Sequence, residues 1–290
     1  MPEHVWNLRY AAHLGLASPD GRLLQFGPGQ DDVLRQIEHV AEIGFGGIFD
    51  SMLKTRPASL QAEMGAALRQ FGLAMGTFVN GIETWNLPLW NTPGDAAARA
   101  RRVDEITESI AAAARVGGRH VTVTTGLLPG VPEAEQRLCM ADALADIAPM
   151  AEQAGIILLV EATSSAWVPG LLITSIVHAA ELVAAVDSPA VRLLFDVAHV
   201  EAMDGDVVRH LDQCWPLIGA IQIADAPGRT DVGTGTLDWT PILGLISRKG
   251  WQGLIEIEHY PNTPGPEGEK ALLDQLARVD AAIRQGTAGA

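Results

Sequence analysis

The chain has 290 residues and a formal net charge of −15 at pH 7. Hydrophobic residues make up 48% of it and charged residues 19%, a composition that excludes intrinsic disorder because it supplies a large core. The acidic balance argues against a nucleic-acid partner, since such binding normally rests on Lys and Arg neutralising phosphates. No run approaches the roughly 18 uncharged apolar residues of a membrane span, so we expect no membrane partner.

The start of the chain and its cysteines bear on the cellular compartment. Residues 1–9 contain no apolar core of the kind found in signal peptides. Cys139 and Cys214 lie in apolar segments and fit two buried thiols better than a disulfide framework. We therefore expect a cytoplasmic protein.

Short apolar or β-branched segments alternate with longer segments of helical periodicity. This alternation predicts βαβ units and a parallel sheet. The predicted strands cover residues 10–16, 47–50, 73–80, 120–126, 157–161, 191–196, 220–225 and 254–258. Eight strand–helix units close an α/β barrel of the (β/α)8 TIM type, which is the predicted fold. No Pro-, Gly- or Ser-rich linker divides the chain, so residues 1–290 are expected to form one domain.

Two long irregular segments follow predicted strands. They cover residues 80–94, rich in Trp, Pro and Asn, and residues 163–173. Loops after strands form the catalytic face of a TIM barrel. These two loops are therefore candidate lids over an active site.

Four predicted strands end on a residue able to bind a metal ion. These residues are Glu161, Asp196, Gln222 and Glu258. An unpaired buried charge costs several kcal/mol, so carboxylates at equivalent barrel positions need a shared partner, which one divalent cation would supply. Three carboxylates and one amide oxygen suit Mg²⁺ or Mn²⁺ better than zinc. Glu256, on the same strand face but one layer deeper, is an alternative to Glu258.

Three further residues are candidates for substrate binding. His199 follows Asp196 by three residues, where its imidazole would reach a substrate, although a solvated loop histidine is the alternative. Arg229 lies just beyond a Pro-Gly turn and would bind an anionic or hydroxylated substrate through two N–H groups, unless it is paired on the surface. His13, in the first predicted strand, is a third candidate.

The C-terminal half of the chain carries a resemblance to a known family. The motifs are Leu194-Phe-Asp-Val-Ala-His199, Ile221-Gln-Ile-Ala-Asp-Ala-Pro-Gly-Arg229, and Gly250-Trp-Gln-Gly253 leading to Glu258. Together they resemble the hydroxypyruvate isomerase family, within the superfamily of xylose-isomerase-like barrels. The resemblance is strong over residues 155–261 and only architectural before them.

The resemblance implies roles for specific residues. The metal ligands of the family would be Glu161, Asp196, Gln222 and Glu258, with Glu161 and Glu258 also its proton-transfer pair. His199 and Arg229 would contact substrate. Where the family has an Asn-rich segment after the first glutamate, this chain has Ala162-Thr-Ser-Ser-Ala-Trp167, which leaves the substrate open. The resemblance also leaves open whether the protein forms a homo-oligomer.

These observations lead to a functional hypothesis. The chain would be a metal-dependent isomerase of a small sugar or hydroxy-keto acid. One glutamate would remove a proton next to the carbonyl, forming an enediolate, and the other would return a proton. Return to the adjacent carbon is aldose–ketose isomerisation, and return to the opposite face of the same carbon is epimerisation.

Other functions remain compatible with the same constellation. A ketose 3-epimerase or a polyol dehydratase would use the same metal site, and a non-catalytic sugar-binding barrel would need no proton transfer. A DNA-repair endonuclease of the same superfamily is disfavoured. It would need extra histidines for several metals and a basic surface, whereas Gln222 stands where a histidine would be expected and the chain is acidic.

Overall fold

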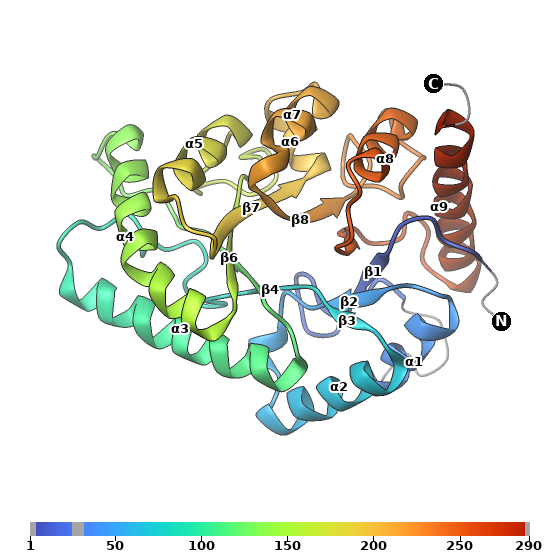
Figure 1. Ribbon diagram of the computed structural model, residues 1–290, viewed down its shortest axis with the longest axis horizontal. Helices are drawn as coiled ribbons and strands as arrows, with labels where there is room; N and C mark the ends of the chain where they lie inside the picture. The colour runs from blue at the N-terminus through green and yellow to red at the C-terminus, as the bar shows by residue number, and fades with distance from the viewer. Residues whose placement is uncertain (1–3, 25–31, 288–290) are drawn as a thin grey trace.

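The computed structural model describes residues 4–24 and 32–287. Over these residues, nine parallel strands form one sheet that curls into a barrel, with helices on its outside (Figure 1). This is the predicted TIM barrel. The strands are β1 (Tyr10–His13), β2 (Gly47–Phe49), β3 (Ala74–Met75), β4 (Thr77–Val79), β5 (His120–Val123), β6 (Ile157–Glu161), β7 (Val191–Asp196), β8 (Ile218–Ile223) and β9 (Ile255–Ile257).

The third predicted strand is divided at Gly76, and its two parts stand at the two ends of the strand order. Its first part, β3, pairs with β2, and its second part, β4, pairs with β5. The Gly76 N–H donates to the Ile48 carbonyl at 2.7 Å, and the Asp50 N–H donates to the Thr77 carbonyl at 3.1 Å, so contact with β2 continues past the division. A side chain at position 76 would collide with the Glu256 carboxylate, so this close approach requires glycine.

The helices follow the strands in the order that the sequence predicts. They are α1 (Val33–Glu42), α2 (Ala58–Phe71), α3 (Ala96–Val116), α4 (Glu133–Ala154), α5 (Ile176–Val186), α6 (Val197–Met203), α7 (Val207–Cys214), α8 (Trp239–Arg248) and α9 (Pro266–Thr287), with 3₁₀ turns at Leu53–Thr55 and Trp215–Leu217. Glycines in the left-handed conformation end several of them, for example Gly117 after α3 and Gly155 after α4. No helix among the described residues is long and apolar enough to cross a membrane.

The barrel interior contains an apolar layer below a polar one. Leu159, Leu194 and Ala220 form a small buried cluster separate from the main core between strands and helices. Side chains two residues apart point to the same face of a strand. The residues two positions further along β6, β7 and β8 therefore stand above this cluster, at the carboxyl ends of the strands.

Candidate functional site

The strand ends bring the predicted polar residues to one rim of the barrel. Glu161 is the last residue of β6, Asp196 the last of β7, and Gln222 lies one residue before the end of β8. Glu258 follows β9 directly. The register pairs Asp196 with Gln222 across β7 and β8. The alternation that keeps the layer below apolar on β6, β7 and β8 thus delivers Glu161, Asp196 and Gln222 to this rim, and Glu258 joins them from β9, where the residue below it is Glu256.

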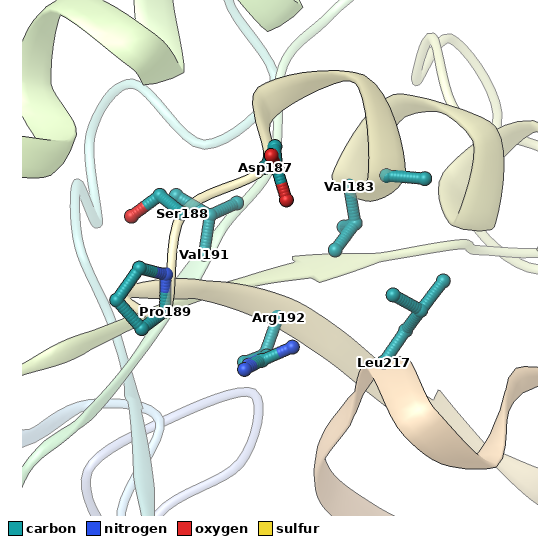
Figure 2. A pocket seen from close by; sticks show the side chains of 8 residues that line it. Val183, Asp187, Ser188, Pro189, Val191, Arg192 and Leu217 are labelled. Atoms are coloured by element: carbon teal, nitrogen blue, oxygen red, sulfur yellow. The ribbon is translucent and has the colours of Figure 1, made fainter.

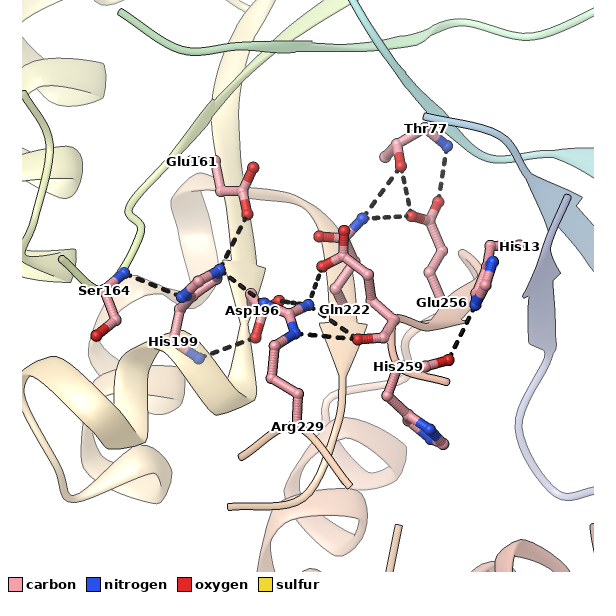
Figure 3. Close-up of polar contacts among 11 residues, drawn as sticks. His13, Thr77, Glu161, Ser164, Asp196, His199, Gln222, Arg229, Glu256 and His259 are labelled. Atoms are coloured by element: carbon pink, nitrogen blue, oxygen red, sulfur yellow. Dashed lines mark hydrogen bonds and ion pairs between the residues drawn. The ribbon is translucent and has the colours of Figure 1, made fainter. Parts of the chain in front are cut away.

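Arg229 lies at the centre of this rim and links several of its residues (Figure 3). Its Nη2 donates to Asp196 Oδ2 at 2.9 Å, to the Glu258 carboxylate, and to the Glu258 carbonyl at 2.9 Å. Its Nη1 lies 2.7 Å from His199 Nε2. Two of the three predicted substrate contacts, Arg229 and His199, therefore form one cluster with two of the predicted metal ligands, Asp196 and Glu258.

His199 has more hydrogen-bond donors around it than it can accept. The Ser164 N–H donates to Nδ1 at 3.0 Å, while Arg229 Nη1 faces Nε2. Burial lowers the pKa of His199 to about 4, so the ring is neutral at pH 7. A neutral imidazole accepts at only one nitrogen and carries a proton on the other. With Nδ1 occupied by Ser164, the Nε2 proton opposes Arg229, so this contact of Arg229 is the one most readily exchanged for a ligand.

The environment separates the pKa values of the three carboxyl groups. Burial, reinforced by the charge of Asp196, raises the pKa of Glu161 to about 8. Burial also raises the pKa of Glu258 well above its ordinary value, although Arg229 opposes the change. Burial acts on Asp196 in the same direction and is the largest single influence, but Arg229, His199 and the hydrogen bonds to the carboxylate together outweigh it, and the pKa falls to about 2. The cluster thus combines one aspartate whose pKa is lowered with two glutamates whose pKa values are raised.

The donor set of this rim fits a hard divalent cation. Ligand atoms of Glu161, Asp196 and His199 all lie within 4.8 Å of one another. Gln222 Oε1 is buried and has no hydrogen-bond partner in the part of the chain that the structure describes. Carboxylate and amide oxygens are the ligands that Mg²⁺ and Mn²⁺ prefer. His199 belongs to this group by distance, but its Nδ1 is occupied by Ser164 and its Nε2 carries a proton, so the oxygen atoms are the available ligands.

Trp167 covers the cluster, a role that the sequence did not indicate. Its ring centroid lies 5.7 Å from Arg229 Cζ and 5.2 Å from the centroid of the His199 ring. The residue belongs to the irregular segment 163–173 that follows β6, one of the predicted lids. The only signal in the sequence was an aromatic residue in a loop after a strand that ends in glutamate.

Asp225 holds the loop that carries Arg229, and sequence reasoning missed it as well. Its fully buried carboxylate accepts from three backbone N–H groups of residues 226–237 and from the Trp239 indole, at 2.8 to 3.1 Å. A side chain at position 235 would collide with this carboxylate, which explains the glycine there. Arg229 itself adopts a left-handed conformation with φ of 55°. Asp225 therefore maintains the turn that places the guanidinium.

A sequence profile of the xylose isomerase-like TIM barrel family matches residues 37–279. The chain belongs to this family. It is 28% identical over 193 residues to the hydroxypyruvate isomerase of Escherichia coli, covering 62% of this chain and 75% of that protein. It is 26% identical over 223 residues to a 2-oxo-tetronate isomerase of Cupriavidus necator, covering 75% of this chain and 84% of that protein.

Solved structures confirm the fold of this xylose isomerase-like barrel. An L-ribulose 3-epimerase superposes with a TM-score of 0.75 at 19% identity, over 96% of this chain and 95% of that chain. A structure described as an AP endonuclease of family 2 from Brucella melitensis gives a TM-score of 0.75 at 22% identity, over 91% of this chain and 96% of that chain. At these identities the likeness concerns the fold alone.

His13 lies apart from the Arg229 cluster. It ends β1 and is fully buried, and its Nε2 lies 2.9 Å from the carbonyl of His259. Its ring makes edge contacts with Phe49 and Tyr260, and burial lowers its pKa to about 4. Figure 3 shows it on the side opposite to Glu161. Its role as a substrate contact stays a prediction.

A surface depression of about 250 Å³ lies at the other end of the barrel (Figure 2). Its lining includes Ser188, Val191 and Arg192, at the amino-terminal start of β7. Chemistry in TIM barrels takes place at the carboxyl ends of the strands. We therefore assign the candidate site to the rim around Arg229 and not to this depression.

Proposed function

We propose that the chain is a metal-dependent isomerase of a small hydroxy-carbonyl compound, either a sugar or a hydroxy-keto acid. The observation that carries this proposal is the rim at the strand ends, where the carboxyl groups of Glu161, Asp196 and Glu258 meet an amide oxygen of Gln222 that has no hydrogen-bond partner among the described residues. The relatives in Escherichia coli and Cupriavidus necator, both named as isomerases, support it.

We assign one Mg²⁺ or Mn²⁺ to the oxygens of Glu161, Asp196, Gln222 and Glu258. When bound, the ion would act as a Lewis acid that stabilises negative charge on substrate oxygens. Asp196 and Glu258 are at present neutralised by Arg229. When the metal ion neutralises these carboxylates instead, the guanidinium of Arg229 would become free to bind a substrate.

Glu161 and Glu258 would move the protons. In its ionised form, one of them removes the proton from the carbon next to the carbonyl, giving an enediolate. The other, in its protonated form, returns a proton to the adjacent carbon. Burial raises the pKa of both side chains, which favours the protonated form that the proton-returning glutamate needs.

Arg229 and His199 would bind the substrate. Arg229 donates from the end of its guanidinium to an anionic or hydroxyl group, and the His199 Nε2–H donates to a second oxygen. Trp167 shields both from water. The free thiols of Cys139 and Cys214 support a reducing, cytoplasmic setting for this reaction.

Metal removal and reconstitution test the proposal. The chelator-treated protein is expected to be inactive on hydroxypyruvate, 2-oxo-tetronate and short aldoses, and Mg²⁺ or Mn²⁺ is expected to restore isomerisation of at least one of them. Product analysis separates an isomerised product from an epimer or a dehydrated compound. Full activity after chelation, verified by metal analysis, would contradict a metal-dependent reaction.

A further inference from the structure

A buried polar group lies directly below the proposed cation site and is formed by Glu256, Thr77 and Gln222. Glu256 Oε1 accepts from the Thr77 N–H at 2.8 Å, and Oε2 accepts from the Thr77 hydroxyl at 2.6 Å. Gln222 Nε2 donates to Glu256 Oε2 at 3.1 Å and to Thr77 Oγ1 at 3.3 Å. Figure 3 shows the three side chains grouped on one side of the rim. All three residues are at most 2% exposed.

This group determines which end of the Gln222 amide faces the site. The amide nitrogen donates toward both Glu256 and Thr77, while Oε1 remains without a partner among the described residues. Turning the amide over would place Oε1 against the carboxylate of Glu256, which brings two acceptors together. The carboxylate therefore keeps the amide oxygen on the side away from Glu256.

Glu256 differs from its neighbour on the strand in what neutralises it. Glu258 contacts the guanidinium of Arg229, whereas the hydrogen-bond donors that the structure shows for Glu256 are all uncharged. Gly76 leaves the space for this carboxylate, since any side chain there would collide with it. A carboxylate buried without a cationic partner is costly to the fold. Its retention here calls for a role, and orienting Gln222 supplies one.

We propose that Glu256 is a positioning residue that holds Gln222 with its amide oxygen available to the metal ion. This inference rests on the cation site of the proposed function. Glu256 itself supplies no ligand to the ion. It acts as an acceptor that fixes the amide, in the way that residues behind metal ligands commonly orient them.

The substitution Glu256→Gln tests the inference without changing the size of the side chain. Its carbonyl oxygen still accepts from the Thr77 N–H, but its amide nitrogen then faces the amide nitrogen of Gln222. The two donors separate when Gln222 turns over, which directs N–H groups toward the cation site. We expect the dissociation constant of the metal-free protein for Mn²⁺ to rise about 10- to 100-fold, as measured by titration calorimetry.

Two further variants separate orientation from a merely structural role. Thr77→Val removes the hydroxyl but leaves Glu256 as the acceptor for Gln222, so the dissociation constant for Mn²⁺ is expected to change less than about threefold. The double variant Glu256→Gln with Gln222→Glu exchanges the amide and the carboxylate. It restores an acceptor–donor pair and returns an oxygen to the site, so its affinity for Mn²⁺ is expected to recover.

The outcomes distinguish the two proposals. If the wild-type protein binds no Mn²⁺, the metal site fails and the inference fails with it. If the wild type binds Mn²⁺ and folded Glu256→Gln binds it equally well, only the inference is overturned. If the single variant does not fold, the double variant still decides the test. An affinity for Mn²⁺ near that of the wild type supports the inference. A loss of tenfold or more in that affinity contradicts it.

Discussion

Two clusters of arginine and carboxylate lie at the same rim of the barrel, after β2 and after β7 to β9, and they differ in how completely they are satisfied. In the first, Arg56 Nε donates to Asp50 Oδ2 at 2.5 Å, and its Nη2 donates to the carbonyls of Leu14 and Pro19. The other oxygen of Asp50 accepts from the Met52 N–H at 3.2 Å. This cluster is complete within its own loops.

The second cluster is incomplete. Arg229 is shared between Asp196, Glu258 and His199, and the histidine faces one donor too many. Gln222 has an oxygen without a partner in the described residues. Buried polar groups are normally satisfied within the fold, so unsatisfied ones mark places where a ligand completes the network. The comparison teaches that similar residues at the same rim serve as scaffold or as site according to whether the chain itself supplies their partners.

The largest expected effect concerns the proton-transfer pair of the incomplete cluster. Glu161→Gln and Glu258→Gln are each expected to lower kcat by about 10²- to 10⁴-fold, because a carboxamide cannot exchange the proton. Steady-state assays with the metal-loaded protein measure this, and circular dichroism verifies the fold. Glu135→Gln, on the exposed face of α4, is the control and should keep full activity. A Glu161 or Glu258 variant that retains more than about a tenth of the activity would refute that residue's role.

Replacing the arginine of each cluster tests directly whether one cluster serves stability and the other serves activity. Arg56→Met leaves the charge of Asp50 buried and is expected to lower the free energy of unfolding by about 3–5 kcal/mol, with little change in turnover per folded molecule. Arg229→Met is expected to lower activity strongly but to destabilise the fold less, because Arg229 is partly exposed and its loss opens the carboxylates to water, cations and protons. Urea unfolding and activity assays measure both. Equal destabilisation by the two variants would contradict the distinction.

His120, at the start of β5, belongs to neither cluster and reports on the scaffold. Burial lowers its pKa from 6.5 to about 4, so the unfolded chain binds a proton before the folded protein does as the pH falls. The neutral ring adds its full contribution to the free energy of unfolding above pH 6.5, and this contribution is lost as the pH falls from 6.5 to 4. His120→Gln should reduce the loss of unfolding free energy between pH 6.5 and 5 by about 1–2 kcal/mol. Urea unfolding at a series of pH values measures this, and an unchanged acid slope would count against it.

The smallest expected effect concerns the cover of the incomplete cluster. Trp167→Ala removes a ring stacked near Arg229, a contact of about 0.5–2 kcal/mol, and is expected to raise KM about 2- to 30-fold with little change in kcat. Trp167→Phe keeps an aromatic face and should lose less. Steady-state kinetics on the preferred substrate separate KM from kcat. If the alanine variant lost kcat and kept its KM, Trp167 would not act through substrate binding.

Most of the fold could be predicted from the sequence, because strand and helix periodicities alternate regularly along the chain. Because side chains alternate between the two faces of a strand, the sequence also predicted that Glu161 and Asp196 lie above an apolar layer. The division of the third strand at Gly76 was not predicted, since it depends on pairing with two different neighbours and on the distant carboxylate of Glu256.

The residues that sequence reasoning missed act through contacts between distant parts of the chain. Thr77 and Glu256 are separated by 179 residues, and no local pattern connects them. Trp167 reaches Arg229 from a different loop. Asp225 ends the predicted strand 220–225, where its side chain looks like another potential ligand, but in the structure it lies two residues beyond β8. Strand ends identify which residues reach the rim. Only the three-dimensional structure shows which of them are already satisfied there.

The most direct test of proton abstraction is ¹H NMR in D₂O with the Mg²⁺-loaded protein and a panel of keto acids, tetroses, pentoses and hexoses. The account predicts metal-dependent incorporation of deuterium at the carbon next to the carbonyl of at least one compound, and its loss in Glu161→Gln or Glu258→Gln. Absence of deuterium across the whole panel, with the metal shown to be bound, would contradict an isomerase and favour a dehydratase or a sugar-binding barrel.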